Sequence, residues 1–127
     1  MKNEELRLNI LSEKIIGSAF EVSNVLGSGF LEKIYENALK IELEMNGLDA
    51  QQQAHLAVHY KGELVGTYFA DLLVENAIIV ELKAAKTLEG VHTAQCLNYL
   101  KGTGLKLCLL INFGKPKVEI KRLVNNI

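Results

Sequence analysis

The stretch from Asp71 to Lys83 constrains the fold more than any other part of the sequence. Two runs of aliphatic and β-branched residues flank a short polar break at Glu75-Asn76. This pattern predicts a β-hairpin with largely buried strands. Asp71, Glu81 and Lys83 interrupt the two runs. Because charged side chains are rarely buried without partners, we expect these three residues to have partners and a function.

The length of the hairpin loop decides whether the two acids meet. A two-residue loop would place Asp71 and Glu81 on opposite faces of the sheet, whereas a three-residue loop, residues 75–77, pairs Asp71 with Glu81. The longer loop also pairs Phe69 with Lys83, which shares a face with Glu81 because the two are two residues apart. The opposite face is then wholly apolar: Ala70, Leu72, Val74, Ile78, Val80 and Leu82. Three-residue loops are common in hairpins, and burial favours the register that separates the faces, so we predict this loop.

Two carboxylates side by side repel each other unless a cation or a proton lies between them. The simplest interpretation of Asp71 opposite Glu81 is therefore a divalent metal site. A structural salt bridge between Lys83 and the carboxylates is the alternative, although such a bridge needs only one acid.

The remaining pattern predicts the element order ααβββαββ, a single mixed α/β sheet with helices against it, in one domain spanning residues 1–127. The expected helices cover about residues 4–26, 31–45 and 90–101, and the expected strands about 50–60, 64–74, 77–84, 105–112 and 117–122. The apolar face of the first helix is predicted to be Leu8, Leu11, Ile15, Ala19, Val22 and Leu26. That of the second is predicted to be Leu31, Ile34, Ala38, Ile41 and Met45.

Charge and composition exclude several classes of protein. The net charge of −1 argues against a strong non-specific nucleic-acid binder, although residues 61–127 carry nine basic against six acidic residues, which permits a phosphate-binding face. The longest apolar run is too short to cross a membrane, and no signal peptide is visible. Cys96 and Cys108 lack the CxxC spacing of zinc and iron–sulfur sites. We therefore expect a cytoplasmic protein with two reduced thiols.

Two helices carry polar residues that could serve a site. Glu32 and Tyr35 share a face of the second helix. If Gly29 is the N-cap, however, Glu32 lies at N3, where an acid is favoured by capping alone, and Tyr35 is simply a half-buried aromatic. On the third helix, His92, Gln95 and Tyr99 form a polar stripe opposite Val91, Ala94 and Leu97. This stripe could equally be a solvated face.

These residues together resemble a known superfamily. Asp71 followed by Glu81-x-Lys83 resembles the PD-(D/E)xK motif of the restriction-endonuclease-like nucleases. Gln95-x-x-x-Tyr99 is similar to the QxxxY motif that follows it in RecB-type exonuclease domains.

A third motif points to a smaller group within that superfamily. Gly29-x-x-Glu32-x-x-Tyr35 is similar to the signature of the small bacterial and archaeal GxxExxY proteins. The resemblance covers nearly the whole chain, from about residue 11 to residue 122. Ala70 stands before the aspartate where the superfamily motif has proline, a position that is only loosely kept.

The resemblance implies a restriction-endonuclease-like core and the hydrolysis of nucleic-acid phosphodiester bonds, with DNA the expected substrate, in repair or defence. It implies that Mg²⁺ or Mn²⁺ is held by Asp71, Glu81 and the Leu82 carbonyl, with Glu32 completing the site directly or through water. A homodimer is plausible for such a small nuclease.

The resemblance also implies roles for three further side chains. Lys83 would position or help deprotonate the attacking water, and Gln95 would orient Lys83 or the metal shell. Tyr99 would contact the phosphate or pack below it. The alternative is a nuclease-fold module that binds nucleic acid or protein without significant turnover.

Overall fold

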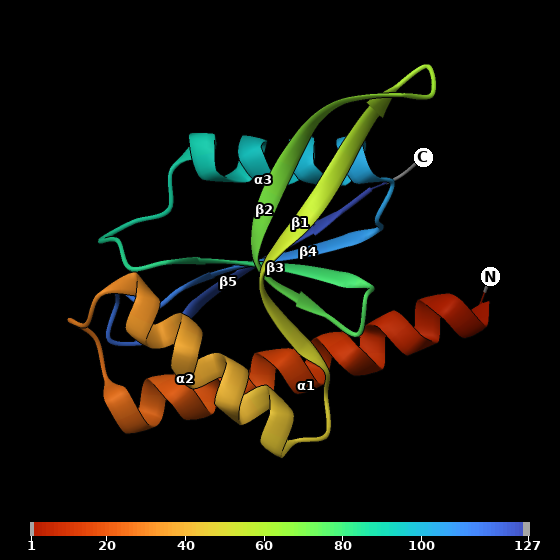
Figure 1. Cartoon of the computed structure of the whole chain (residues 1–127). Coiled ribbons are helices and arrows are strands. Elements are labelled where there is room, and N and C mark those ends of the chain that lie inside the picture. The colour runs from red at the N-terminus through yellow and green to blue at the C-terminus, as the bar shows by residue number, and fades with distance from the viewer. Residues whose placement is uncertain (1, 126–127) are drawn as a thin grey trace.

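The computed structural model describes residues 2–125, which form a five-stranded mixed sheet between helices (Figure 1). The elements are α1 (Lys2–Leu26), α2 (Glu32–Met45), β1 (Ala50–Tyr60), β2 (Glu63–Val74), β3 (Ile78–Lys83), α3 (Gly90–Thr103), β4 (Leu107–Asn112) and β5 (Glu119–Val124). The strands lie side by side in chain order, and only the β3–β4 pair is parallel. This is the predicted order and the predicted fold class. Only the last strand is displaced, by two residues.

Two apolar clusters hold the sheet, one on each face. The larger contains the predicted face of α1 and packs α1 and α2 against residues such as Leu72, Val80 and Leu109. The smaller contains Cys96 and Tyr99 of α3. Figure 1 shows α1 and α2 on one side of the sheet and α3 on the other. Side chains of the central strands are therefore covered on both faces, as a parallel crossover such as β3–α3–β4 requires.

The predicted apolar face of α2 is wrong. Leu31, Ile41 and Met45 are 76%, 60% and 74% exposed. The buried residues of the helix are instead Tyr35, Glu36, Leu39 and Leu43. The helix carries two apolar stripes of similar spacing, and the one that faces the sheet is the one that contains Tyr35.

Tyr35 fixes the choice between the stripes because it holds the start of the helix in place. Its ring stacks on Phe113 with centroids 4.6 Å apart. Its hydroxyl donates to the Gly27 carbonyl at 2.6 Å and accepts from the Phe30 N–H at 3.2 Å. Tyr35 is thus fully buried rather than half-buried, and it closes the turn between α1 and α2.

The proposed capping role of Glu32 is also wrong. The N-cap residue of α2 is Leu31, so Glu32 occupies the first helical position and not the third. Gly29 lies in the turn before the helix with a φ of 109°, a conformation that favours glycine. The acid still lies at the favourable end of the helix dipole.

The three-residue hairpin loop is confirmed. Leu72 pairs with Val80 and Val74 with Ile78, leaving residues 75–77 as the loop. The ladder between β2 and β3 ends at Leu72, however, so the expected pairing of Phe69 with Lys83 does not form.

Beyond that point β2 bends away from β3 and continues with β1 alone. The bend moves Ala70 off the apolar face on which it was expected, and it packs in the α3 cluster instead. Gln53 of β1, opposite the bend, has a φ of 47° and interrupts the regular alternation of that strand.

The polar stripe of α3 is only partly buried: Tyr99 packs against the sheet, His92 is half-buried and Gln95 is exposed. Tyr99 is 7% exposed, whereas Val91 is 66% exposed on the opposite side. His92 has a structural role, because its Nδ1 accepts the N–H of Glu89 in a capping box that begins the helix.

Candidate active site

Asp71 and Glu81 meet where β2 and β3 separate. The Asp71 N–H donates to Glu81 Oε2 at 3.2 Å, and the Leu82 N–H donates to Asp71 Oδ2 at 2.8 Å. Each carboxylate is thereby held by the backbone of the other strand. The structure thus brings together the two acids that the hairpin register predicted.

Glu81 is poorly matched to its surroundings as an anion. It is 7% exposed. Burial, together with the side-chain hydrogen bond and the negative charge of Asp71, raises the pKa of Glu81 to about 9. Without a cation, this pair holds a proton at neutral pH. A buried pair of acids of this kind is suited to a cation, because a bound positive charge would allow both carboxyl groups to ionise.

Lys83 follows Glu81 on β3 and is half-buried. It takes part in none of the ion pairs formed within residues 2–125, so the structural salt bridge considered above does not form. Its charge acts on α3: the pKa of Cys96 is lowered mainly by a hydrogen bond from the Cys108 thiol and also by the Lys83 ammonium. By strand alternation, Lys83 shares a face of β3 with Glu81 and with Ile79, which packs in the α3 cluster.

Gln95 and Tyr99 approach the site from α3. The Gln95 amide donates to the Tyr99 hydroxyl at 2.8 Å. Burial and, to a smaller extent, the charge of Glu81 together raise the pKa of Tyr99 to about 12. The hydroxyl is therefore a neutral donor close to the acids. The predicted contact of Gln95 with Lys83 is replaced here by a contact with Tyr99.

Glu32 is not brought to the acid pair. It is exposed at the start of α2. Within residues 2–125, no group of three or more acidic, histidine or cysteine side chains is arranged to hold a metal ion. Its role as a ligand stays a prediction.

The acid of α2 that reaches the site is Glu36, which the motifs did not single out. It is 5% exposed and is hydrogen-bonded to Lys33, Gln52 and Gln53. The Gln53 amide donates both to Glu36 Oε1 at 3.0 Å and to Asp71 Oδ1 at 3.3 Å. A charged residue on a helix face that also carries Tyr35 and Leu39 was the available signal in the sequence.

The backbone of Gln53 supports a functional role for this bridge. Among residues 2–125, the other non-glycine residues with positive φ are Lys61, Glu75 and Asn76, all in turns. Gln53 adopts this conformation inside a strand. The conformation costs energy, and it persists only where the surrounding structure imposes it. Here the strained backbone aims an amide between two carboxylates.

The residues present fit a hard divalent cation. The donor set is carboxylate oxygen, with the Leu82 carbonyl next in sequence, and Mg²⁺ usually binds one or two carboxylates while keeping several waters. Two acids are therefore sufficient, and Glu36 is linked to this pair only through the Gln53 amide.

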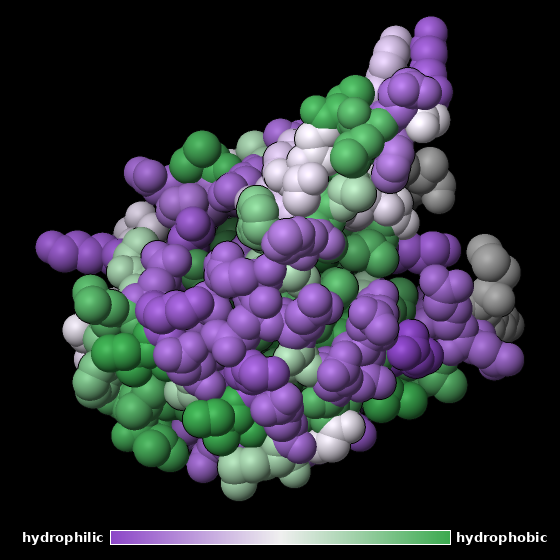
Figure 2. Space-filling view, viewed as in Figure 1, coloured by the Kyte–Doolittle hydropathy of each residue, from purple (hydrophilic) through white to green (hydrophobic). Residues whose placement is uncertain are grey.

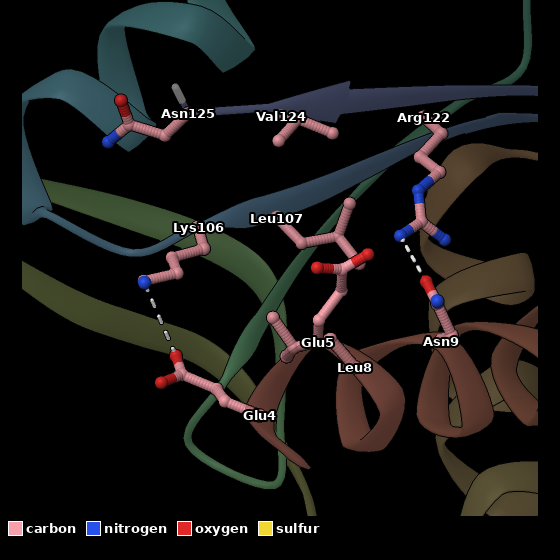
Figure 3. Close-up of a pocket in the computed structure, with 9 residues that line it drawn as sticks. All are labelled: Glu4, Glu5, Leu8, Asn9, Lys106, Leu107, Arg122, Val124 and Asn125. Carbon is pink, nitrogen blue, oxygen red and sulfur yellow. Dashed lines mark hydrogen bonds and ion pairs between the residues drawn. The ribbon is translucent and has the colours of Figure 1, made fainter. Parts of the chain in front are cut away.

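A cavity lies elsewhere in the molecule (Figure 3). It has a volume of about 390 Å³ and lies between the start of α1 and the ends of β4 and β5 near Leu107 and Val124. Arg122 donates to Asn9 at 2.6 Å there, and Lys106 is 3.7 Å from Glu4. Leu107 is at the opposite end of β4 from Asn112, which pairs with Lys83. The cavity is thus remote from the acid pair.

Known proteins that are similar to this chain share its fold. The sequence model of the PD-(D/E)XK nuclease superfamily matches residues 9–123. No curated protein matches the chain. The crystal structure of SSO0001 is similar with a TM-score of 0.57 and 17% identity, over 75% of this chain and 51% of that one. The chain thus spans about half the length of SSO0001.

An alkaline exonuclease (LHK-Exo) from Laribacter hongkongensis has a TM-score of 0.53 and 13% identity, over 94% of this chain and 70% of that one. Identities this low show a shared fold alone. Since the superfamily model covers nearly the whole sequence, the identification goes further: the chain belongs to the PD-(D/E)XK nuclease superfamily. Within residues 2–125, no helix has the length and apolar character needed to cross a membrane.

The raised pKa of Glu81 predicts a pH-dependent stability in the presence of a chelator. The unfolded chain releases this proton near pH 4.5, whereas the folded protein keeps it up to about pH 9. The free energy of unfolding therefore falls as the pH rises through this window, by at most about 1.4 kcal/mol per pH unit from this group. Denaturant unfolding at several pH values should show a smaller slope for Glu81→Gln than for the wild type. Equal slopes would contradict the assignment.

Proposed function

We propose that the protein is a metal-dependent nuclease that hydrolyses phosphodiester bonds in nucleic acid, with DNA the expected substrate and repair or defence the expected context. The observation that supports this most directly is the meeting of Asp71 and Glu81, because each carboxyl group accepts a backbone N–H from the strand of the other. A domain of this superfamily that had lost its chemistry would have no need to bury two acids together.

The proposed roles follow from the position of each group. Asp71, Glu81 and the Leu82 carbonyl would hold Mg²⁺ or Mn²⁺. When bound, such an ion lowers the pKa of a coordinated water and stabilises charge on phosphate oxygens. Lys83 would orient the attacking water, accept or relay its proton, and offset negative charge that develops on the phosphate.

Groups from α2 and α3 would position the reacting centre. Tyr99 would donate its neutral hydroxyl to a phosphate oxygen, and Gln95 would set the direction of that hydroxyl. Gln53 would keep Glu36 and Asp71 aligned, because its amide contacts both carboxylates.

The alternative is a nuclease-fold module that binds nucleic acid or protein without significant turnover. The near-neutral net charge favours it, since tight binding to a phosphate backbone usually comes with a basic surface. The acid pair favours the nuclease, because a carboxylate near phosphate opposes binding unless a cation lies between them.

We further propose that the chain is one of the GxxExxY proteins and that it acts in the cytoplasm. The motif is supported by its structural consistency: Gly29 adopts a positive φ and Tyr35 closes the turn onto Gly27. The location is supported by two cysteines that are both free and buried.

A homodimer through α2 is a further part of the proposal. The exposed stripe that contains Leu31, Ile41 and Met45 leaves apolar area in water. Figure 2 shows hydrophobic atoms gathering at the lower-left margin, where Figure 1 places the end of α1 and the turn into α2. Antiparallel pairing of two copies of α2 would cover the stripe and bring Lys33 of one copy near Glu44 of the other.

The mass of the protein in solution tests the dimer. We expect the wild type to elute as a dimer in size-exclusion chromatography with light scattering, and Ile41→Asp to elute as a monomer. Val65→Asp, which alters a similarly exposed residue outside α2, should remain dimeric. A wild type that is monomeric at every concentration would contradict the interface.

A cleavage assay tests the nuclease. With Mg²⁺ or Mn²⁺, the wild type should cleave plasmid or single-stranded DNA. Asp71→Asn removes a proposed metal ligand and Lys83→Ala removes the group proposed to act in proton transfer, so each should lower the cleavage rate about 100-fold or more. Lys86→Ala serves as the control, because Lys86 is an exposed lysine three residues further on. Cleavage that survives both site substitutions would come from a contaminant.

Metal binding can be measured without turnover. Mn²⁺ should raise the melting temperature of the wild type, because binding to the folded state stabilises it, and Glu81→Gln should lose most of that increase. Since Glu36 contacts the site and Glu32 does not, Glu36→Gln should reduce the increase more than Glu32→Gln does. No increase at millimolar Mn²⁺ in the wild type would contradict the metal site.

A further inference from the structure

The β1–β2 hairpin extends beyond the rest of the sheet as a two-stranded arm, defined here as residues 55–69. Figure 1 shows the arm crossing α3 after β2 has left β3, with its tip extending beyond the helix. One face of the arm is covered: Leu56 and Tyr68 pack in the α3 cluster, and the Tyr68 ring lies 4.5 Å from that of Tyr99.

The opposite face carries an exposed pair of rings. His55 and Phe69 are directly opposed on β1 and β2, with ring centroids 4.6 Å apart and an interplanar angle of 75°. His55 is exposed, and Phe69 is 51% exposed. This edge-to-face contact leaves part of the Phe69 ring open to solvent. Cross-strand contact alone would stabilise the arm modestly, but it does not account for a phenylalanine that stays half in water.

The pair lies directly next to the acid pair along both strands. Phe69 is two residues before Asp71 on β2, and His55 is two residues after Gln53, whose amide contacts Asp71 Oδ1 at 3.3 Å. Two residues of a strand span about 7 Å. A nucleotide adjacent to a phosphate at Asp71 is therefore within reach of the rings.

The charge of the arm favours contact with a base over contact with phosphate. Lys61 and Glu63 are its only acidic or basic residues apart from histidine, and they lie at the tip. Figure 2 shows hydrophobic, weakly polar and hydrophilic atoms mixed along the arm, and a mostly hydrophilic surface below it. Aromatic side chains bind single-stranded nucleic acid by stacking on base faces, which are neutral and present in every base.

We propose that His55 and Phe69 form a stacking platform for an unpaired base of the nucleotide next to the scissile phosphate. This inference rests on the proposed nuclease function and adds a substrate class to it: nucleic acid whose bases are unpaired beside the cut, as in single strands or frayed ends. A base inside a duplex would first have to leave its stack, at a cost of a few kcal/mol.

The test combines a protein variant with a change in the DNA. Binding of a single-stranded oligonucleotide and of a blunt duplex is measured by fluorescence anisotropy with Ca²⁺, on the Asp71→Asn background so that no cleavage occurs. Phe69→Ala should weaken single-strand binding about tenfold or more and leave duplex binding nearly unchanged, whereas Phe69→Trp should retain single-strand affinity. Leu64→Ala, at an exposed apolar residue near the tip of the same arm, is the matched control and should have little effect.

An oligonucleotide with abasic positions separates stacking from folding. If the platform holds a base, abasic positions should lower the affinity of the protein that keeps Phe69. They should leave the affinity of the Phe69→Ala protein almost unchanged, because the two changes remove the same contact. Equal losses in both proteins would overturn the proposal, as would equal effects of Phe69→Ala and Leu64→Ala. If the wild type cleaves DNA but Phe69→Ala binds single strands as tightly as the protein that keeps Phe69, the platform alone is refuted. A wild type that neither binds nor cleaves refutes the nuclease proposal itself.

Discussion

The placement of two carboxyl groups against each other's backbone is the interaction on which the site depends. Asp71 accepts the N–H of Leu82, and Glu81 accepts the N–H of Asp71, at the position where the ladder between their strands has ended. These side-chain contacts replace the backbone hydrogen bonds that the two strands would otherwise exchange. The strands can therefore separate without leaving these N–H groups unsatisfied, which would be costly.

The separation of the strands depends on support from three other elements. On one side, Gln53 adopts a strained backbone and links Asp71 to Glu36 of α2. On the other side of the sheet, Tyr99 of α3 packs against Tyr68. The charge of Glu81 contributes to the raised pKa of Tyr99. The two helices therefore hold the bend in β2 from opposite faces of the sheet, and a site with buried acids is stable because both faces are packed.

The sequence predicted the parts of this arrangement that follow from local periodicity. Alternating apolar residues around Glu75-Asn76 favoured one hairpin register, and burial leaves a strand little choice once one face is wholly apolar. The second helix had no such constraint. Its two apolar stripes have similar spacing, and the stacking of Tyr35 on Phe113, far away in the sequence, decides which of them is buried.

The site residues show the same limit. Asp71, Glu81 and Lys83 lie close together in one hairpin, so their spacing could be interpreted directly. Glu36 and Gln53 become neighbours of Asp71 only through the packing of α2 on the sheet, and no spacing in the sequence indicates that contact. The structure offers an acid from α2, as the motif did, but one turn further along the helix than Glu32.

The bend that assembles the acids also creates the arm, so the two features cannot vary independently. If β2 continued alongside β3, Phe69 would lie opposite Lys83 within the sheet, and its ring would be covered by neighbours instead of open to solvent. Departure of the strand at Leu72 leaves a gap beside Asp71 and exposes the next outward-facing side chains of the hairpin at once. In this chain the residues that would carry out hydrolysis and those that would contact the neighbouring nucleotide are thus consecutive positions on the same two strands. A change in the register or length of the hairpin would therefore alter both together.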